Sequence, residues 1–258
     1  MNTTANSEFV GPESTEFTGA RRAPNFDRLA KVYRWMELLT FGPVLSRCRT
    51  AFLSQLGSAH RALVLGDGDG RFTAELLGVN SEVRIDAVDA SPAMLDALLH
   101  RAGLNGRRVT PHCADVREWI PEDTRYDLVA THFFLDCLTT GECHRLAARL
   151  RGAVSPSAVW IVSEFAVPEG WFGQLVARPL VWLLYWAFGL LTGLEIRSLP
   201  NHHDALREAG FVLTGRRSWI CGLLVSETWR SKTQTEGRRM ALILNSNSSA
   251  IEPQGTLS

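Results

Sequence analysis

A glycine-rich turn at 66–70 (GDGDG) follows the apolar run 62–65 and precedes the helical pattern 71–78. Glycines in such a turn let the backbone bend tightly and let a ligand lie against the main chain, because no Cβ stands in the way. A strand, a glycine turn and a helix in succession begin a βαβ unit. We therefore expect an α/β fold around a mainly parallel sheet.

The rest of the chain continues this alternation of short apolar runs and longer helical patterns, which is typical of βαβ units. We expect strands at 62–65, 83–88, 107–113, 126–134 and 157–165, and two closing strands within 211–229 that join near 215–218. Helices are expected at 71–78, 91–103 with Ser91 as N-cap and Pro92 in the first position, 142–152, and 201–210.

The spacing of the glycines indicates which ligand the turn binds. A dinucleotide-binding turn carries glycines at its first, third and sixth positions, but the sixth position counted from Gly66 is Arg71. The acids Asp67 and Asp69 would also repel a pyrophosphate. The turn therefore favours a ligand that carries positive charge over a dinucleotide.

Two further acids follow the next two predicted strands. Asp89 ends the second strand, where a carboxylate can accept hydrogen bonds from both hydroxyls of a ribose, each worth about 1.5–3 kcal/mol. Asp115 follows the third strand and can accept from the exocyclic amine of a purine, with Val116 and Cys113 to pack its ring. A glycine turn and two acids after successive strands predict a nucleoside-containing ligand.

This combination resembles the class I S-adenosylmethionine-dependent methyltransferases over roughly residues 61–229: LVLGDGDGRF is similar to their first motif, IDAVDAS to the ribose motif and CADVREW to the adenine motif. The resemblance implies a Rossmann-like three-layer sandwich whose seven-stranded, mostly parallel sheet has an antiparallel last strand. It implies S-adenosylmethionine as cofactor. The chain departs from the family at Val64, where most members carry an acid that orients the amino-acid end of the cofactor; Asp67 and Asp69 are the candidates to compensate. The implied cofactor-binding residues are Gly66, Asp67, Gly68, Gly70, Asp89, Ala90, Asp115, Val116 and Thr131.

The family's acceptor site lies beyond the ends of the fourth and fifth strands, near Glu164 among others. His132 is the candidate general base, since an imidazole with a pKa near ~6.5 suits proton removal; the competing interpretation is that it only hydrogen-bonds the backbone. Asp136 is read either as a helix cap or as a base. Residues 25–40 resemble the cap helix of small-molecule methyltransferases. The implied acceptor contacts are Tyr33, Phe133, Asp136 and His202.

The segment 179–194 contains no charged residue and four large aromatics. It is shorter than the about 20 apolar residues of a membrane span. A helix that is apolar all round must be buried, pair with another subunit or touch lipid. Burial, a homodimer contact, and a peripheral membrane contact or lipophilic acceptor site all stay open, and a lipophilic acceptor such as a quinone precursor is one hypothesis.

Composition narrows the remaining choices. The 27 basic and 27 acidic side chains cancel, so we expect no nucleic-acid partner. Five scattered cysteines without a CxxC pair indicate a reducing, cytoplasmic setting and predict no metal site. We expect disordered tails at 1–20 and mostly at 231–258, cap helices at 21–58, and a methyltransferase domain at 59–230 with an apolar insertion at 171–197.

The predicted function is methyl transfer from S-adenosylmethionine to a small, lipophilic acceptor. Two alternatives stay open. One is a methyltransferase-like module that binds a partner and has lost catalysis, for which Val64 is the sequence hint. The other is a nucleotide-dependent oxidoreductase, which Arg71 and the acids of the turn disfavour.

Overall fold

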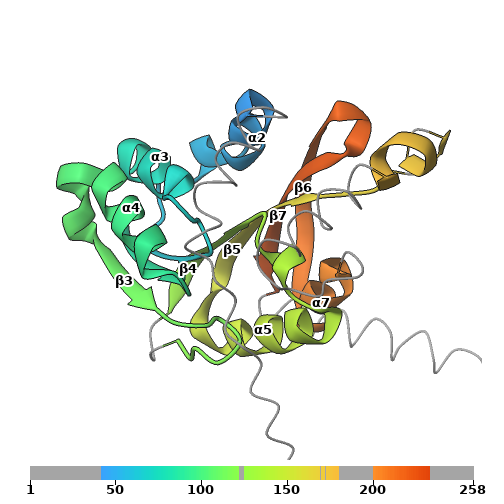
Figure 1. The fold of residues 1–258 in the computed structure, drawn as a ribbon. Coiled ribbons are helices and arrows are strands. Elements are labelled where there is room, and N and C mark those ends of the chain that lie inside the picture. The colour runs from blue at the N-terminus through green and yellow to red at the C-terminus, as the bar shows by residue number, and fades with distance from the viewer. Residues whose placement is uncertain (1–41, 122–124, 169, 172, 180–199, 233–258) are drawn as a thin grey trace, which may run out of the picture.

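A computed structural model of the chain describes residues 42–121, 125–168, 170–171, 173–179 and 200–232. Within these ranges a seven-stranded sheet runs through the molecule in the order β3-β2-β1-β4-β5-β7-β6 (Figure 1). β7 is antiparallel to both of its neighbours, β5 and β6, while the pairs from β3 to β5 are parallel. This confirms the predicted fold class. The strands are β1 Arg61–Leu65, β2 Arg84–Asp89, β3 Val109–Cys113, β4 Tyr126–His132, β5 Val154–Phe165, β6 Phe211–Trp219 and β7 Leu224–Ser231.

Helices lie on both faces of the sheet (Figure 1). The α-helices are α2 Gly42–Arg49, α3 Arg71–Val79, α4 Pro92–Ala102, α5 Thr140–Ala153 and α7 His202–Glu208. Short turns of 3₁₀-helix are η1 Leu53–Gln55, η2 Gly103–Arg108, η3 Leu135–Cys137 and η5 Ile220–Gly222, and η4 Gly173–Ala177 is a π-helix.

Two apolar cores fill the space between the layers. On one face α5 and α7 pack on the sheet around Trp160 and Trp229, which are both fully buried. On the other face α3, α4 and η1 pack around Phe72 and Leu76. Strands covered on both faces read as near-continuous apolar runs, and residues 62–65 of β1 and 128–130 of β4 read in this way. The sandwich therefore presents the carboxyl ends of β1, β2, β4 and β5 as one edge.

Local signals position the helices beside this edge. The Ser91 hydroxyl accepts a hydrogen bond from the N–H of Met94 at 3.3 Å, and Pro92 occupies the first turn of α4, as predicted. Thr139 and Glu142 form a capping box that begins α5. Both caps lie at the ends of loops that leave the carboxyl edge of the sheet.

The closing hairpin turns later than predicted. The turn lies at η5, residues 220–222, where Ile220, Cys221 and Gly222 all have positive φ. The predicted turn at 215–218 is wrong, because Gly215 lies inside β6 at a register shift opposite β7. A Cβ at Gly215 would stand 2.8 Å from the Thr228 hydroxyl. The glycine therefore marks a bulge that lets the two strands approach closely.

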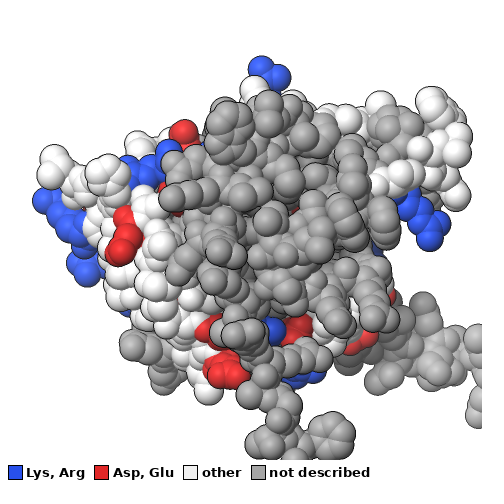
Figure 2. Space-filling view, viewed as in Figure 1, with Lys and Arg blue, Asp and Glu red and all other residues white. Residues whose placement is uncertain are grey.

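Several predictions fall partly or wholly outside the described residues. The cap helix at 25–40 with Tyr33, residues 180–194 of the apolar segment, and both tails belong to this group. The described part of the predicted cap region, 42–58, contains α2 and η1. Among the described residues, no helix has the length and apolar character needed to cross a bilayer. Figure 2 shows one face of the molecule, where the described residues around the edge form small, separate groups of acidic and of basic side chains.

Candidate active site

The glycine turn after β1 is shaped by packing at two positions and is open at the third. Gly66, Gly68 and Gly70 have φ of 64°, 59° and 78°, a conformation that side chains rarely adopt. A Cβ at Gly66 would overlap the ring of Phe134, and one at Gly70 would overlap Leu98. At Gly68 the nearest atom would be the Sδ of Met94, at 3.9 Å. The turn thus leaves space for a ligand against the backbone of Gly68.

The acids of the turn point into the protein's own structure. The Asp67 carboxylate accepts hydrogen bonds from the N–H groups of Phe72 at 3.2 Å and Thr73 at 2.8 Å, which caps α3. Burial raises the pKa of Asp67, against these hydrogen bonds and the nearby charge of Arg49. Asp69 pairs with Arg101 at 2.6 Å and Arg71 at 3.2 Å. Both carboxylates therefore have partners within the protein.

Asp89 stands at the carboxyl end of β2 beside the glycine turn. Its Oδ1 accepts a hydrogen bond from the N–H of Ser91 at 2.9 Å. Burial raises the pKa of Asp89 to about 6, and the charge of Asp67 adds to this, while hydrogen bonds from Ser91, Gly68 and Ala90 act in the opposite direction. A desolvated carboxylate of this kind gains by meeting hydroxyl donors.

Asp115 and Val116 lie in the loop after β3. The guanidinium and the backbone N–H of Arg117 donate hydrogen bonds to the Asp115 carboxylate. These hydrogen bonds lower the pKa of Asp115. About a third of the Asp115 side chain stays exposed, with a relative area of 35%, whereas Val116 is buried. Arg149 holds the carbonyls of Val116 and Arg117 at 3.0 and 3.1 Å, which fixes the loop. Any purine amine at Asp115 shares the carboxylate with Arg117.

These residues fit the cofactor that the resemblance implies. Gly68 offers open backbone, Asp89 a carboxylate held in position by main-chain amides, and Asp115 a partly exposed acceptor after the next strand. The register places Leu65 beside Val88 and Asp89 beside Cys113, so these three elements follow one another along the carboxyl edge of the sheet. Ligands of open α/β sheets bind at this edge, where the strand order reverses. Here the order reverses between β1 and β4.

The end of β4 is more deeply buried than the sequence suggested. Thr131 is fully buried, and its hydroxyl accepts a hydrogen bond from the indole N–H of Trp160 at 3.0 Å, so its side chain belongs to the core. The His132 ring packs on Phe72 with centroids 4.3 Å apart, and its Nδ1 lies 2.9 Å from the Ser163 hydroxyl. Burial, together with the charge of Arg49, lowers the pKa of His132 to about 3. His132 is therefore a neutral imidazole and a weak base.

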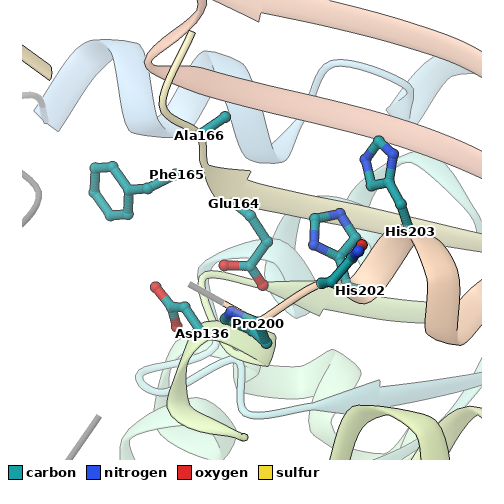
Figure 3. Close-up of a pocket in the computed structure, with 8 residues that line it drawn as sticks. Asp136, Glu164, Phe165, Ala166, Pro200, His202 and His203 are labelled. Carbon is teal, nitrogen blue, oxygen red and sulfur yellow. The ribbon is translucent and has the colours of Figure 1, made fainter. Parts of the chain in front are cut away.

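A cavity of about 160 Å³ lies beyond the ends of β4 and β5 (Figure 3). Figure 3 shows the carboxylates of Asp136 and Glu164 turned toward each other, with the ring of His202 on the opposite side of Glu164. Asp136, predicted as either a cap or a base, lies in η3 and is 7% exposed. The cavity combines acids with apolar and imidazole groups: it is lined by Asp136, Glu164, Phe165, Ala166, Pro200, Asn201, His202 and His203.

Glu164 is the most unusual group of this cavity. Its Oε1 accepts hydrogen bonds from the N–H groups of Phe134 at 3.1 Å and Leu135 at 2.8 Å. Its Oε2 is buried and has no hydrogen-bond partner among the residues that the structure describes. Burial and the charge of Asp136 raise the pKa of Glu164 well above its ordinary value, despite the backbone amides. An unpartnered buried oxygen of this kind calls for a ligand that brings a donor.

Arg49, at the end of α2, was not among the residues predicted from the sequence. Arg49 is 8% exposed, and its guanidinium lies 5.3 Å from the centre of the Phe133 ring. Phe133 is itself buried, has a φ of 54°, and packs against Phe165 with centroids 5.3 Å apart. The charge of Arg49 opposes the rise in the pKa of Asp67 and contributes to the low pKa of His132, so Arg49 acts on both the glycine turn and the end of β4. An arginine in an arginine-rich chain carries no distinguishing sequence signal.

Glu227, at the centre of β7, was not predicted from the sequence either. Its side chain is fully buried, and its carboxylate meets the Nε2 atoms of His202 at 3.4 Å and His203 at 2.9 Å. Burial would raise the pKa of Glu227, but the two imidazoles outweigh it and lower the value to about 2. His202, predicted as an acceptor contact, thus lines the cavity and also binds this carboxylate.

Comparison with known proteins agrees with this geometry. Residues 62–157 match the family model described as a methyltransferase domain. No curated protein sequence matches the chain. Similar solved structures include an O-methyltransferase family protein from Burkholderia thailandensis, with 16% identity, a TM-score of 0.61, and coverage of 81% of this chain and 61% of that one. Mitomycin 7-O-methyltransferase has 16% identity, a TM-score of 0.60, and coverage of 80% and 60%.

Human N-acetylserotonin methyltransferase, solved in complex with S-adenosylmethionine, has 16% identity, a TM-score of 0.56, and coverage of 80% of this chain and 55% of that one. The chain thus spans about three fifths of the length of these structures. At this sequence identity, the similarity to solved structures shows the fold alone. The match to the family model shows that the domain is a methyltransferase domain. The chain therefore contains a class I, S-adenosylmethionine-dependent methyltransferase domain.

Proposed function

We propose that the protein transfers the methyl group of S-adenosylmethionine to a small acceptor bound in the cavity between Asp136, Glu164 and His202. The observation that carries this proposal is the unpartnered Oε2 of Glu164, buried beside Asp136 where β5 ends. A cavity with two buried acids, one of them Glu164 with a raised pKa, at the ligand-binding edge of an α/β sheet has the features of a catalytic site.

In this proposal the cofactor lies along the edge formed by β1, β2 and β3. Asp89 accepts from the ribose hydroxyls, with Ala90 beside it, and Asp115 and Val116 contact the adenine. The backbone at Gly66, Gly68 and Gly70 supports the amino-acid end. Arg49 takes the carboxylate of that end, since it is buried and its charge reaches the glycine turn. Asp67 acts indirectly by capping α3, and Thr131 by packing under the site.

The bound cofactor supplies a methyl group on a positively charged sulfur, which makes that carbon open to attack. When bound, the cofactor would supply this methyl group to an oxygen or nitrogen of the acceptor, and the electron pair of the broken carbon–sulfur bond would stay on sulfur. The acceptor must also lose a proton. Glu164, with its raised pKa, is a stronger base than an exposed carboxylate once it is ionised. We therefore move the role of base from His132 to the Asp136–Glu164 pair.

The cavity lining favours an acceptor with an apolar body and one polar, proton-bearing group. Phe165, Ala166 and Pro200 supply the apolar wall, while the acids supply the polar end. Two of the similar structures carry O-methyltransferase in their names, which supports a hydroxyl acceptor. A lipophilic acceptor, including a quinone precursor, belongs to this class. In this proposal Phe133 backs the apolar wall through its ring contact with Phe165.

The test is a search for acceptor-dependent formation of S-adenosylhomocysteine. Purified protein is incubated with S-adenosylmethionine and a panel of phenols, hydroxyquinones and amines that differ in apolar size. We expect turnover with at least one phenol or hydroxyquinone and its loss in Glu164→Gln. Glu208→Gln, on the exposed side of α7, is the matched control. Cofactor binding without turnover on any acceptor would favour the alternative of a methyltransferase-like binding module, and binding of NAD alone would favour an oxidoreductase.

A further inference from the structure

We propose that His202, His203 and Glu227 form a binding site for a divalent transition-metal ion of the zinc type. The two histidines begin α7, and the glutamate lies in the centre of β7. One ligand atom from each of the three residues lies within 4.8 Å of the other two. Two imidazoles and a carboxylate are a donor set that binds zinc and similar ions.

The distances suit such an ion. Bonds of 2.0–2.1 Å in a tetrahedral site place neighbouring ligand atoms about 3.3 Å apart. The Nε2 of His202 lies 3.4 Å from Oε2 of Glu227, and the Nε2 of His203 lies 2.9 Å from Oε1. The two rings stand at 74° with centroids 4.6 Å apart, so neither blocks the other. An ion between the three atoms needs each imidazole to carry its proton on Nδ1.

The groups around Glu227 support the donor set. The indole N–H of Trp229 donates to Oε2 of Glu227 at 3.1 Å, which orients the carboxylate from outside the three ligands. The Asn201 side chain caps α7 by accepting from the N–H of Asp204 at 3.2 Å, and so fixes the turn that carries both histidines. Glu227 itself is fully buried. A buried carboxylate is stabilised by a cation at close range.

One group competes for the site. The Nε of Arg216 lies 3.5 Å from Oε1 of Glu227. Its side chain is about half exposed, at 48%, so it can turn into solvent when an ion brings positive charge to the carboxylate. The imidazoles are 13% and 27% exposed, and both line the cavity that also contains Asp136 and Glu164. A fourth ligand, either water or a donor atom of a bound molecule, can therefore approach from the cavity.

None of the three ligands is a cofactor residue or the proposed base, and His202 and His203 also line the acceptor cavity, so metal binding is measured directly and not through activity. It is tested by titrating the full chain with zinc in a calorimeter and with cobalt by visible absorption. The background is the double variant Cys113→Ser, Cys221→Ser, because both thiols are exposed and would bind these ions themselves. We expect one ion per chain, a tetrahedral cobalt spectrum without a thiolate band, and a higher Tm with zinc.

The variants His202→Gln and His203→Gln should each weaken zinc binding at least tenfold, with circular dichroism to confirm that they fold. The matched control is His144→Gln, which removes an imidazole that pairs with Glu208 at 3.0 Å outside the cluster. The control should bind zinc as the parent does. Absence of a one-to-one site in the parent, or equal affinity in the parent and His203→Gln, would overturn the proposal.

Discussion

Glu164 and Leu135 are joined by a 2.8 Å hydrogen bond from the Leu135 N–H to Oε1 of Glu164, across 29 residues of sequence. The bond ties the end of β5 to the loop after β4, which carries Asp136. One oxygen of Glu164 therefore has a structural task, while the other is left for chemistry. Glu164 thus both holds the loop that lines the cavity and supplies the proposed base.

Glu164→Gln separates these two tasks. The amide oxygen of glutamine can still accept from Leu135 and Phe134, so the loop should keep its place. The base is lost, and we expect kcat to fall by about 10²–10⁴ with little change in cofactor affinity. In the parent, kcat should rise with pH because the pKa of Glu164 lies above its ordinary value. Steady-state kinetics across pH measure both effects, and unchanged kcat in the variant would remove Glu164 as the base.

Cofactor affinity should depend on pH through Asp89. Its pKa of about 6 in the free protein means that the carboxyl group is protonated at lower pH and cannot accept from two hydroxyls. Binding favours the ionised form, so the association constant should fall about tenfold per pH unit below pH 6. Calorimetric titrations from pH 5 to 8 measure this slope. Asp89→Asn should bind more weakly and lose the slope, whereas a flat profile in the parent would contradict the assignment.

Arg49→Gln should weaken binding of S-adenosylmethionine by about tenfold or more, since a charged hydrogen bond is worth about 1.5–3 kcal/mol. Affinity for 5′-methylthioadenosine, which lacks the amino-acid carboxylate, should not change. Arg47→Gln is the control, because Arg47 lies two residues away on the exposed side of α2. Equal losses for both ligands would show that Arg49 only supports the fold.

Glu227 should stabilise the protein in a pH-dependent way. Its pKa is lowered to about 2 from 4.5, so its contacts stabilise the fold above pH about 4.5 and are lost as the pH falls toward 2. At about 1.4 kcal/mol per pKa unit, this corresponds to about 3 kcal/mol at neutral pH. Urea unfolding of Glu227→Gln, in metal-free buffer, should show a loss of this order at pH 7 that shrinks at pH 3. A loss equal at both pH values would refute this electrostatic account.

Features that depend on neighbours in sequence were predicted well. The cap at Ser91, the glycine turn and most strand positions arise from residues within one turn or strand, and each has a local signal. The predicted position of the turn in the closing hairpin was wrong because a glycine favours both a turn and a bulge. Only the close approach of Thr228 to Gly215 distinguishes the bulge from the turn.

The chemistry of the candidate site depends on contacts between distant parts of the chain. His203 meets Glu227 only because α7 lies over β7, and no spacing in the sequence encodes that contact. His132 has the residue type of a base, but packing on Phe72 and burial make it a weak one. Residue type and strand position were enough to predict that these side chains lie at the carboxyl edge of the sheet. The pKa of each group at that edge depends on packing, which the sequence does not show.

We expect this chain to bind S-adenosylmethionine at the edge of the sheet that contains Asp89. The direct measurement is calorimetric titration with S-adenosylmethionine, S-adenosylhomocysteine and NAD in parallel, for the parent, Asp89→Ala and the control Asp96→Ala, whose side chain lies on the exposed face of α4. We predict binding of both adenosyl ligands but not of NAD, with affinity reduced about 10- to 100-fold only in Asp89→Ala. Failure of the parent to bind either adenosyl ligand, or equal affinity in Asp89→Ala, would contradict the account.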